Sequence, residues 1–178
     1  MGADREQTVE IWYSFALDKP KPTHSIPQDE WVSTIKALTH IVNDKAKTYV
    51  AGFFNGDLKI FGKHNHAELL SVRQLHPDSM IEDALFLKND ALGKKLVITC
   101  SGSPNVELKV SEVSHVASGK GKQYQFNTIA QSREKHNGES FRCLSSNPMS
   151  NEYVCSGGVI NTAEDGSHEA GVLIWKID

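Results

Sequence analysis

The sequence predicts an all-β protein built from consecutive antiparallel sheets of about four strands each. Its clearest unit is Trp31–Phe61, where three short runs of β-forming residues follow one another and the last two flank the turn Asn55–Asp57. An Asn-Gly pair between two such runs is a strong hairpin signal, because both central residues of the tight turn need positive φ. Similar runs recur twice downstream, and no segment convincingly predicts a helix. The main fold prediction is therefore a repeated four-strand meander.

Three units follow one another along the chain. The predicted strands span 31–38, 48–54, 58–61 and 67–72 in the first unit, 81–87, 95–101, 106–113 and 123–130 in the second, and 140–146, 152–157 and 171–177 in the third. The segment 114–122 is expected to be a mobile surface loop, and 159–170 an insertion in a turn. Repeats of about 40 to 60 residues with four strands each are typical of the blades of a WD-repeat β-propeller, here with the third blade incomplete. A generic β-sandwich is the competing interpretation.

Before the first unit, the sequence predicts a single strand at Thr8–Tyr13 that has no local partner. The following segment, Ala16–Gln28, contains Pro20, Pro22 and Pro27. Proline fixes φ and removes a backbone donor, so this segment is expected to be an extended linker. We therefore divide the chain into residues 1–15, a proline-rich linker at 16–30 and the repeated sheets at 31–178.

The repeats retain only parts of the hydrogen-bonded His–Ser–Asp–Trp set that ties a WD blade together. The residues expected to form this structural motif are Asp57 in the first unit, His76 in the second, and His136, Ser156 and Trp175 in the third. A buried imidazole in this motif is expected to bridge a loop to a hydroxyl on the second strand of its blade. Trp31 is expected to anchor the first blade.

Composition limits the classes of function that fit this chain. With 178 residues and 39% hydrophobic residues it is an ordinary globular domain, and its formal net charge of −3 argues against a strong sequence-independent hold on nucleic acid. Cys100, Cys143 and Cys155 are an odd number without close spacing, which indicates buried thiols in a reducing compartment. No apolar run approaches the roughly 18 residues of a membrane span, and no secretory signal is visible, so no membrane partner is expected.

Candidate reactive groups have simpler structural interpretations. The pair His64 and His66 has a geometry that zinc could use, but nearby ligands other than Glu68 are missing, so an exposed polar loop is expected. A cysteine nucleophile with His76 or His136 has no supporting local signature. We therefore expect no catalytic residue, no metal and no cofactor.

Four short polar motifs are expected to lie on the surface or in turns. Ser101-Gly102-Ser103 and Ser156-Gly157-Gly158 precede no helix and are interpreted as turns between the second and third strands, not as phosphate loops. The adjacent acids Glu82-Asp83 and Glu164-Asp165 are expected to be solvated. A small basic patch that could touch a phosphate backbone, but is more often a solvated loop, consists of Lys120, Lys122, Arg133 and Lys135.

The order of these features resembles one family in particular. A strand ending Glu10-Ile11-Trp12-Tyr13 is followed by the proline-rich linker and then by the junction Gln28-Asp29-Glu30-Trp31-Val32-Ser33-Thr34. This resembles the WD-repeat subunit family of the PeBoW ribosome-assembly complex, in which a ubiquitin-like domain ends on a Glu-Ile-Glu-Tyr-like strand and a His-Asp-Asp-Trp-Val/Ile-Ser-Ser motif opens the propeller. The segment His76–Phe86 is similar as well, with Glu82-Asp83-Ala84 where Lys/Glu-Asp-Val/Ala is usual. The resemblance covers Thr8 to Asp178.

The resemblance implies a non-enzymatic scaffold that acts in assembly of the large ribosomal subunit and maturation of its RNA. It implies pescadillo-like and Bop-like partners, the pre-60S ribosomal particle, and a location in the nucleus and nucleolus. Residues 1–15 could be only the remnant of a ubiquitin-like domain, so docking to the AAA remodelling ATPase is expected only if a full domain lies upstream. The family has seven blades, so this chain is expected to be a fragment.

Two other classes of function stay open from the sequence. One is a different WD-repeat interaction scaffold, such as a ubiquitin-ligase adaptor or a cytoskeletal binder. The other is a hydrolase built on a propeller, which would need an acid, a base and a nucleophile that converge at one channel mouth.

Overall fold

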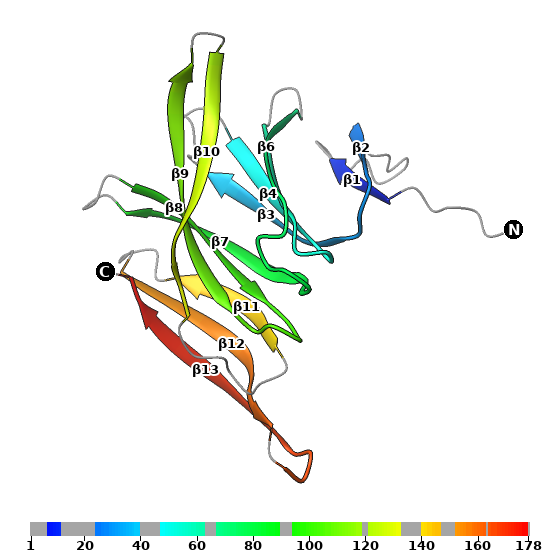
Figure 1. Ribbon diagram of the computed structural model, residues 1–178, viewed down its shortest axis with the longest axis vertical. Helices are drawn as coiled ribbons and strands as arrows, with labels where there is room; N and C mark the ends of the chain where they lie inside the picture. Colours follow the sequence, from blue (N-terminus) through cyan, green and yellow to red (C-terminus); the bar gives the residue numbers. More distant parts are fainter. Residues whose placement is uncertain are drawn as a thin grey trace, which may run out of the picture.

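The computed structural model describes residues 7–11, 24–39, 47–62, 67–89, 94–118, 121–132, 140–146, 152–162 and 164–177. Within these ranges the chain forms thirteen β-strands in four antiparallel sheets and no helix (Figure 1). The prediction of an all-β protein made of consecutive sheets is therefore confirmed.

Each repeated unit of the sequence forms a sheet of its own in which neighbouring strands follow one another in the chain. The first sheet contains β3 (Val32–Thr39), β4 (Lys47–Phe53), β5 (Leu58–Gly62) and β6 (Glu68–Val72). The second sheet contains β7 (Ile81–Asn89), β8 (Lys94–Ser101), β9 (Leu108–Ser118) and β10 (Gly121–Gln131). The third sheet contains β11 (Ser140–Ser146), β12 (Tyr153–Thr162) and β13 (His168–Lys176). Every strand predicted for the three units is present, with ends that shift by a few residues.

The three sheets are layered on one another, with the second sheet in the middle. Its first strand, β7, contacts both β3 and β11, so the first strands of all three sheets lie side by side (Figure 1). One apolar cluster fills the space between the first and second sheets and includes Ile60, Ile81 and Val97. Another fills the space between the second and third sheets and includes Ile98 and Phe141. Alternate side chains of β8 thus enter different clusters, which explains why its sequence reads as a nearly continuous apolar run.

The first and second sheets approach very closely where Gly52 faces Ile81. A Cβ atom at Gly52 would lie 2.7 Å from Cγ2 of Ile81, closer than side chains pack. Beside this contact, the hydroxyl of Ser33 donates a hydrogen bond of 2.5 Å to the carbonyl oxygen of Ile81. Glycine is therefore required here so that the backbone of β4 can lie against the side chain of Ile81.

The N-terminal strand has a local partner, so the prediction that it has none is wrong. β1 (Gln7–Ile11) pairs antiparallel with β2 (His24–Gln28), and Thr8 lies opposite Pro27. A two-stranded ribbon tolerates proline because one edge of each strand carries no ladder. The last part of the expected linker is therefore a strand, whose Ile26 packs against buried Ala51, Phe53 and Phe61 on the outer face of the first sheet.

Two predicted loops are largely strand. β9 runs to Ser118 and β10 begins at Gly121, so most of 114–122 continues a long hairpin. In the third sheet, β12 runs to Thr162 and β13 begins at His168, so the expected insertion lengthens that hairpin too. Ladder pairing extends through these segments although their side chains are small or polar, because backbone hydrogen bonds do not depend on the side chain.

The hairpin at Asn55-Gly56 is present, but its turn differs from the expected tight type. Only Gly56 has positive φ, at 81°, and its N–H donates to the carbonyl oxygen of Phe53 over 3.1 Å. The central residues of the turn are therefore Phe54 and Asn55, and Gly56 takes the left-handed position that follows in a three-residue hairpin loop.

Candidate functional site: a rigid loop platform and a charged seam

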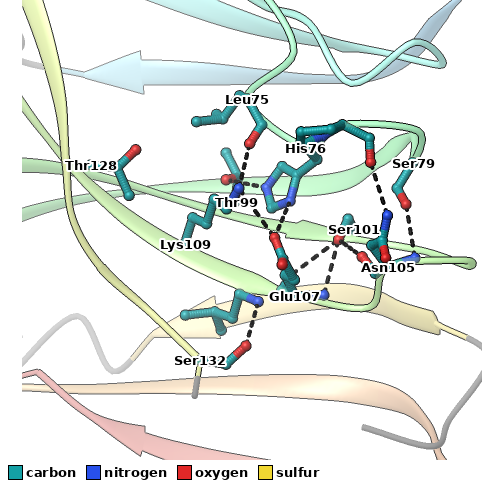
Figure 2. A network of polar contacts seen from close by, with 12 residues as sticks. Leu75, His76, Ser79, Thr99, Ser101, Asn105, Glu107, Lys109, Thr128 and Ser132 are labelled. Atoms are coloured by element: carbon teal, nitrogen blue, oxygen red, sulfur yellow. Dashed lines mark hydrogen bonds and ion pairs between the residues drawn. The ribbon is translucent and has the colours of Figure 1, made fainter. Parts of the chain in front are cut away.

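A set of loops at one end of the first and second sheets is fixed by buried polar contacts; we call it the loop platform and define it as residues 54–57, 74–80 and 101–107. His76 is its centre (Figure 2). The backbone N–H of His76 donates to the carbonyl oxygen of Gly56 over 3.2 Å, which joins the platform to the hairpin of the first sheet. Asp57 accepts a hydrogen bond of 2.7 Å from the N–H of Gln74 and so closes the same junction.

The imidazole of His76 connects the platform to the second sheet. Its Nε2 lies 2.8 Å from the hydroxyl oxygen of Thr99 on β8, within hydrogen-bond distance. Its Nδ1 lies 3.8 Å from a carboxylate oxygen of Glu107, which is too long for a hydrogen bond. Burial and, to a smaller extent, the nearby Lys109 ammonium lower the pKa of His76 to about 3. The ring is therefore neutral at pH 7 and acts as a structural bridge.

Glu107 and Lys109 complete the contacts around this ring, as Figure 2 shows. Lys109 lies 3.1 Å from the Glu107 carboxylate and donates a hydrogen bond of 2.7 Å to the carbonyl oxygen of Leu75. The side chain of Lys109 is largely buried. The sequence does not identify Glu107 and Lys109, because neither matches a residue type of the expected motif, whereas Thr99 fits the hydroxyl expected on the second strand.

The turn that follows β8 is tied to the same platform. The Ser101 hydroxyl donates to the carbonyl oxygen of Asn105 over 2.6 Å, and Asn105 donates through its backbone N–H to the Ser79 hydroxyl over 3.0 Å. Its side-chain amide donates to the carbonyl oxygen of Pro77 over 3.1 Å. The segment Ser101-Gly102-Ser103 is therefore the end of a strand and a turn, as predicted.

A second polar feature, the charged seam, runs across the adjacent first strands of the three sheets. Asp83 on β7 is only 4% exposed and its carboxylate contacts all three sheets. It accepts a hydrogen bond of 2.9 Å from the N–H of Leu144 on β11 and lies 3.2 Å from the ammonium of Lys36 on β3. The prediction that Asp83 is a solvated surface acid is wrong, because the sequence alone does not show that β7 is flanked on both sides.

Glu82 belongs to the same seam and is also largely buried. Its carboxylate lies 3.4 Å from the guanidinium of Arg142 on β11. Burial raises the pKa of Glu82, and the Arg142 charge opposes this rise. The prediction of a solvated Glu82 is wrong for the same reason, whereas Glu164 and Asp165 lie in an exposed turn as expected.

The remaining motif residues lie in two different environments. In the third sheet, the indole N–H of Trp175 donates a hydrogen bond of 2.7 Å to the Ser156 hydroxyl, which is fully buried. Ser156-Gly157-Gly158 lies inside β12, so its interpretation as a turn is wrong. Trp31 is 60% exposed, so it does not anchor the first sheet by burial. Its carbonyl oxygen accepts a hydrogen bond of 2.9 Å from the N–H of Phe54.

Several predicted residues lie outside the described ranges or have no side-chain description. Those outside the ranges are His64, His66, His136, Lys120, Arg133, Lys135, Pro20 and Pro22. The side chain of Lys122 is likewise not described.

The cysteines do not form one cluster in the described part of the chain. Cys100 is buried, its thiol donates to the carbonyl oxygen of Phe141 over 3.6 Å, and burial raises its pKa. Cys143 is exposed and Cys155 is half-buried, both on the third sheet. No group of three or more potential metal ligands gathers within the described ranges. A search of the same residues for helices that could span a membrane finds none.

A polar pocket of about 640 Å³ lies beside the loop platform, between the outer face of the first sheet and the turn after β2. Lys59 projects into it over the ring of Phe53, with 5.2 Å from its nitrogen to the ring centre. The same ammonium donates to the side-chain oxygen of Gln28 over 3.2 Å and lies 3.7 Å from the Glu68 carboxylate. The positive charge of Lys59 is thus already paired with Gln28 and Glu68 of the same chain. The platform and the pocket together form one polar surface.

Neither a scan against models of known protein families nor a search of curated protein sequences finds a match to this chain.

Proposed function

We propose that this chain consists of the first three blades of a WD-repeat β-propeller and that it acts as a protein-binding scaffold without catalytic activity. The observation that carries this proposal is the layering of three consecutive meanders with their first strands side by side. Blades arranged around an axis meet in this way, because the innermost strand of each blade lines the axis. The hydrogen bond from Trp175 to Ser156 and the one between His76 and Thr99 support it, since such bonds tie a blade to its loop and its third strand.

We further propose that the scaffold serves assembly of the large ribosomal subunit, in the nucleus and nucleolus, with pescadillo-like and Bop-like partners. The support is the resemblance of the junction Gln28–Thr34 and of the segment His76–Phe86 to the WD-repeat subunit family of the PeBoW ribosome-assembly complex. The rigid loop platform is consistent with a binding role, because loops that are fixed before binding lose little conformational entropy when a partner arrives. The segment His76–Phe86 contains Asp83, whose carboxylate contacts all three sheets. These contacts give a structural reason for an acid at this position.

Affinity purification of the tagged chain tests the proposed complex. We expect pescadillo-like and Bop-like proteins to be recovered with it, and depletion of the protein to cause precursors of the large-subunit RNA to accumulate. An unrelated tagged WD-repeat protein is the control. Recovery of neither partner, with RNA processing unchanged, would remove the ribosomal assignment and leave the propeller assignment standing.

A different WD-repeat scaffold is the second candidate. It is equally compatible with the bond between Trp175 and Ser156, because that bond supports a WD blade and does not indicate the partner. Recovery of ubiquitin-ligase or cytoskeletal components in the same purification would support it.

A further inference from the structure

The turn between β4 and β5 contains Asn55-Gly56, a residue pair that can modify itself without an enzyme. The side chain of Asn55 is exposed, and Gly56 has no side chain to shield its backbone nitrogen. In deamidation, that nitrogen attacks Cγ of Asn55. The new C–N bond closes a five-membered succinimide ring, the bond from Cγ to Nδ2 breaks, and ammonia leaves with the proton of the Gly56 N–H. Water then opens the ring to aspartate or to isoaspartate.

In the folded turn, hydrogen bonds occupy the atoms that this reaction needs. Nδ2 of Asn55 donates to a carboxylate oxygen of Asp57 over 3.1 Å, and Oδ1 accepts from the Asp57 N–H over 3.0 Å. The attacking nitrogen is also engaged, because the Gly56 N–H donates to the carbonyl oxygen of Phe53 over 3.1 Å. Reaction removes the proton that is bonded to Phe53 and the nitrogen that is bonded to Asp57. It therefore breaks at least two of the three hydrogen bonds.

Neither product fits the place that the turn occupies in the loop platform. Gly56 lies so close to His76 that even a Cβ atom would collide with the His76 carbonyl oxygen, and its own carbonyl oxygen accepts from the His76 N–H over 3.2 Å. Isoaspartate adds a methylene group to the main chain directly before Gly56, which displaces this contact. Aspartate places a carboxylate oxygen where Nδ2 of Asn55 now donates to Asp57, so two negative groups face each other and repel.

We propose that Asn55 is a deamidation site that the folded turn keeps unreacted, and that its conversion irreversibly opens the junction between the first sheet and His76. The reaction proceeds only when the turn opens transiently, so its rate follows the population of the open state. The Asp57 carboxylate keeps the turn closed, because it binds the Asn55 amide and also accepts from the Gln74 N–H over 2.7 Å. Water is the only co-reactant, and the inference holds independently of the proposed function.

The test compares the rate of conversion in the intact protein with the rate in the same protein unfolded by guanidinium chloride, both at mildly alkaline pH. Proteolytic digestion and mass spectrometry measure aspartate and isoaspartate at Asn55. They separate this site from the other Asn-Gly pair of the sequence, Asn137-Gly138. We expect Asn55 to react about tenfold or more slowly in the folded protein, because only the open fraction reacts.

Two substitutions of acids that accept hydrogen bonds in turns show whether Asp57 supplies the protection. Asp57→Asn keeps the shape of the side chain but leaves one acceptor oxygen for the Asn55 amide and the Gln74 N–H. We expect conversion in the folded variant to be about threefold or more faster than in the wild type, each rate being divided by that of its own unfolded chain. Asp165→Asn is the control: Asp165 accepts from the Ser167 N–H in an exposed turn of the third sheet, and the rate at Asn55 should stay unchanged.

The consequence for the platform is measured with Asn55→Asp, which supplies one product directly, and with Asn55→Ala, which removes the amide without adding charge. Hydrogen exchange of the His76 amide, whose acceptor is Gly56, should be about tenfold or more faster in Asn55→Asp than in the wild type and less affected in Asn55→Ala. Circular dichroism checks the sheet content of each variant. Equal conversion in folded and unfolded protein, no faster conversion in Asp57→Asn, or unchanged exchange at His76 in Asn55→Asp would each overturn the proposal.

Discussion

The buried carboxylate of Asp83 gives the sharpest test of how the three sheets are held together. In Asp83→Asn, the amide keeps one acceptor oxygen but cannot accept both the Ala84 N–H at 2.8 Å and the Leu144 N–H at 2.9 Å with the same geometry. One buried donor is left without a partner, which costs about 1–3 kcal/mol. The charge pair with Lys36 adds less than about 1 kcal/mol, because the Lys36 side chain is 47% exposed and screened by solvent.

We therefore expect Asp83→Asn to lower the free energy of unfolding by about 2 kcal/mol, and Lys36→Ala by less than about 1 kcal/mol. Urea unfolding followed by tryptophan fluorescence measures both, with the slope of the transition checked so that stability and not compactness is compared. For a slope of about 2 kcal/mol per molar urea, the midpoint of Asp83→Asn would fall by about 1 M. If the two variants lose equal stability, the exposed ion pair and not the backbone donor dominates, and the argument from burial is refuted.

Three further sets of substitutions test the loop platform and the third sheet. In the folded protein the pKa of His76 is about 3, below the ordinary 6.5, so between these values the unfolded state binds one more proton than the folded state. The free energy of unfolding of the wild-type protein should therefore fall by up to about 1.4 kcal/mol per pH unit as pH drops through that window. His76→Gln should remove this part of the pH dependence. Urea unfolding at pH 7 and pH 5 measures this; an equal pH dependence in the variant would show that other groups cause it. Gly56→Ala should lower the free energy of unfolding by more than about 2 kcal/mol, because φ is 81° and the new Cβ would collide with the His76 carbonyl oxygen. Gly166→Ala is the control: φ is 80° with open space around it, so the loss should be only about 1 kcal/mol. Thermal unfolding measures both. Trp175→Phe should lower the free energy of unfolding by about 1–3 kcal/mol, because it leaves the buried Ser156 hydroxyl without its donor. A double-mutant cycle with Ser156→Ala should show that the two losses are coupled. Purely additive losses of stability would mean that the bond contributes nothing.

The predicted strands were reliable where side chains alternate between two environments. β5 shows why: in Leu58–Gly62, buried Leu58, Ile60 and Phe61 enclose the half-buried Lys59, and that pattern is visible in the sequence. The turn at Gly56 was located for a similar local reason, because the position needs positive φ and only glycine adopts it freely. The sequence predicts a two-residue turn with Asn55 and Gly56 at its centre, whereas the central residues are Phe54 and Asn55. Which residues lie at the centre depends on the register in which the two strands pair.

The polar network around His76 could be predicted only in part. The sequence predicts an imidazole that bridges a loop to a hydroxyl but does not single out Thr99, because Ser101 on β8 also has the right residue type. Glu107 and Lys109 were not anticipated, since a charged pair packed over a histidine resembles a solvated strand end in the sequence. The exposed Trp31 shows the opposite failure: residue type suggested burial, and its neighbours in space leave it open.

The sequence by itself determined the number and order of the strands in the three repeated sheets and the positions of most turns, because these follow from side-chain periodicity and from local backbone preferences along one strand at a time. Only the tertiary structure decided which face of each sheet is covered, that Asp83 is buried between two flanking strands, and that β1 pairs with β2. These outcomes depend on contacts between residues far apart in the chain, and no local pattern carries that information. The charge state and partner of a side chain change with its surroundings, so chemistry at the platform and the seam became visible only once the sheets were layered.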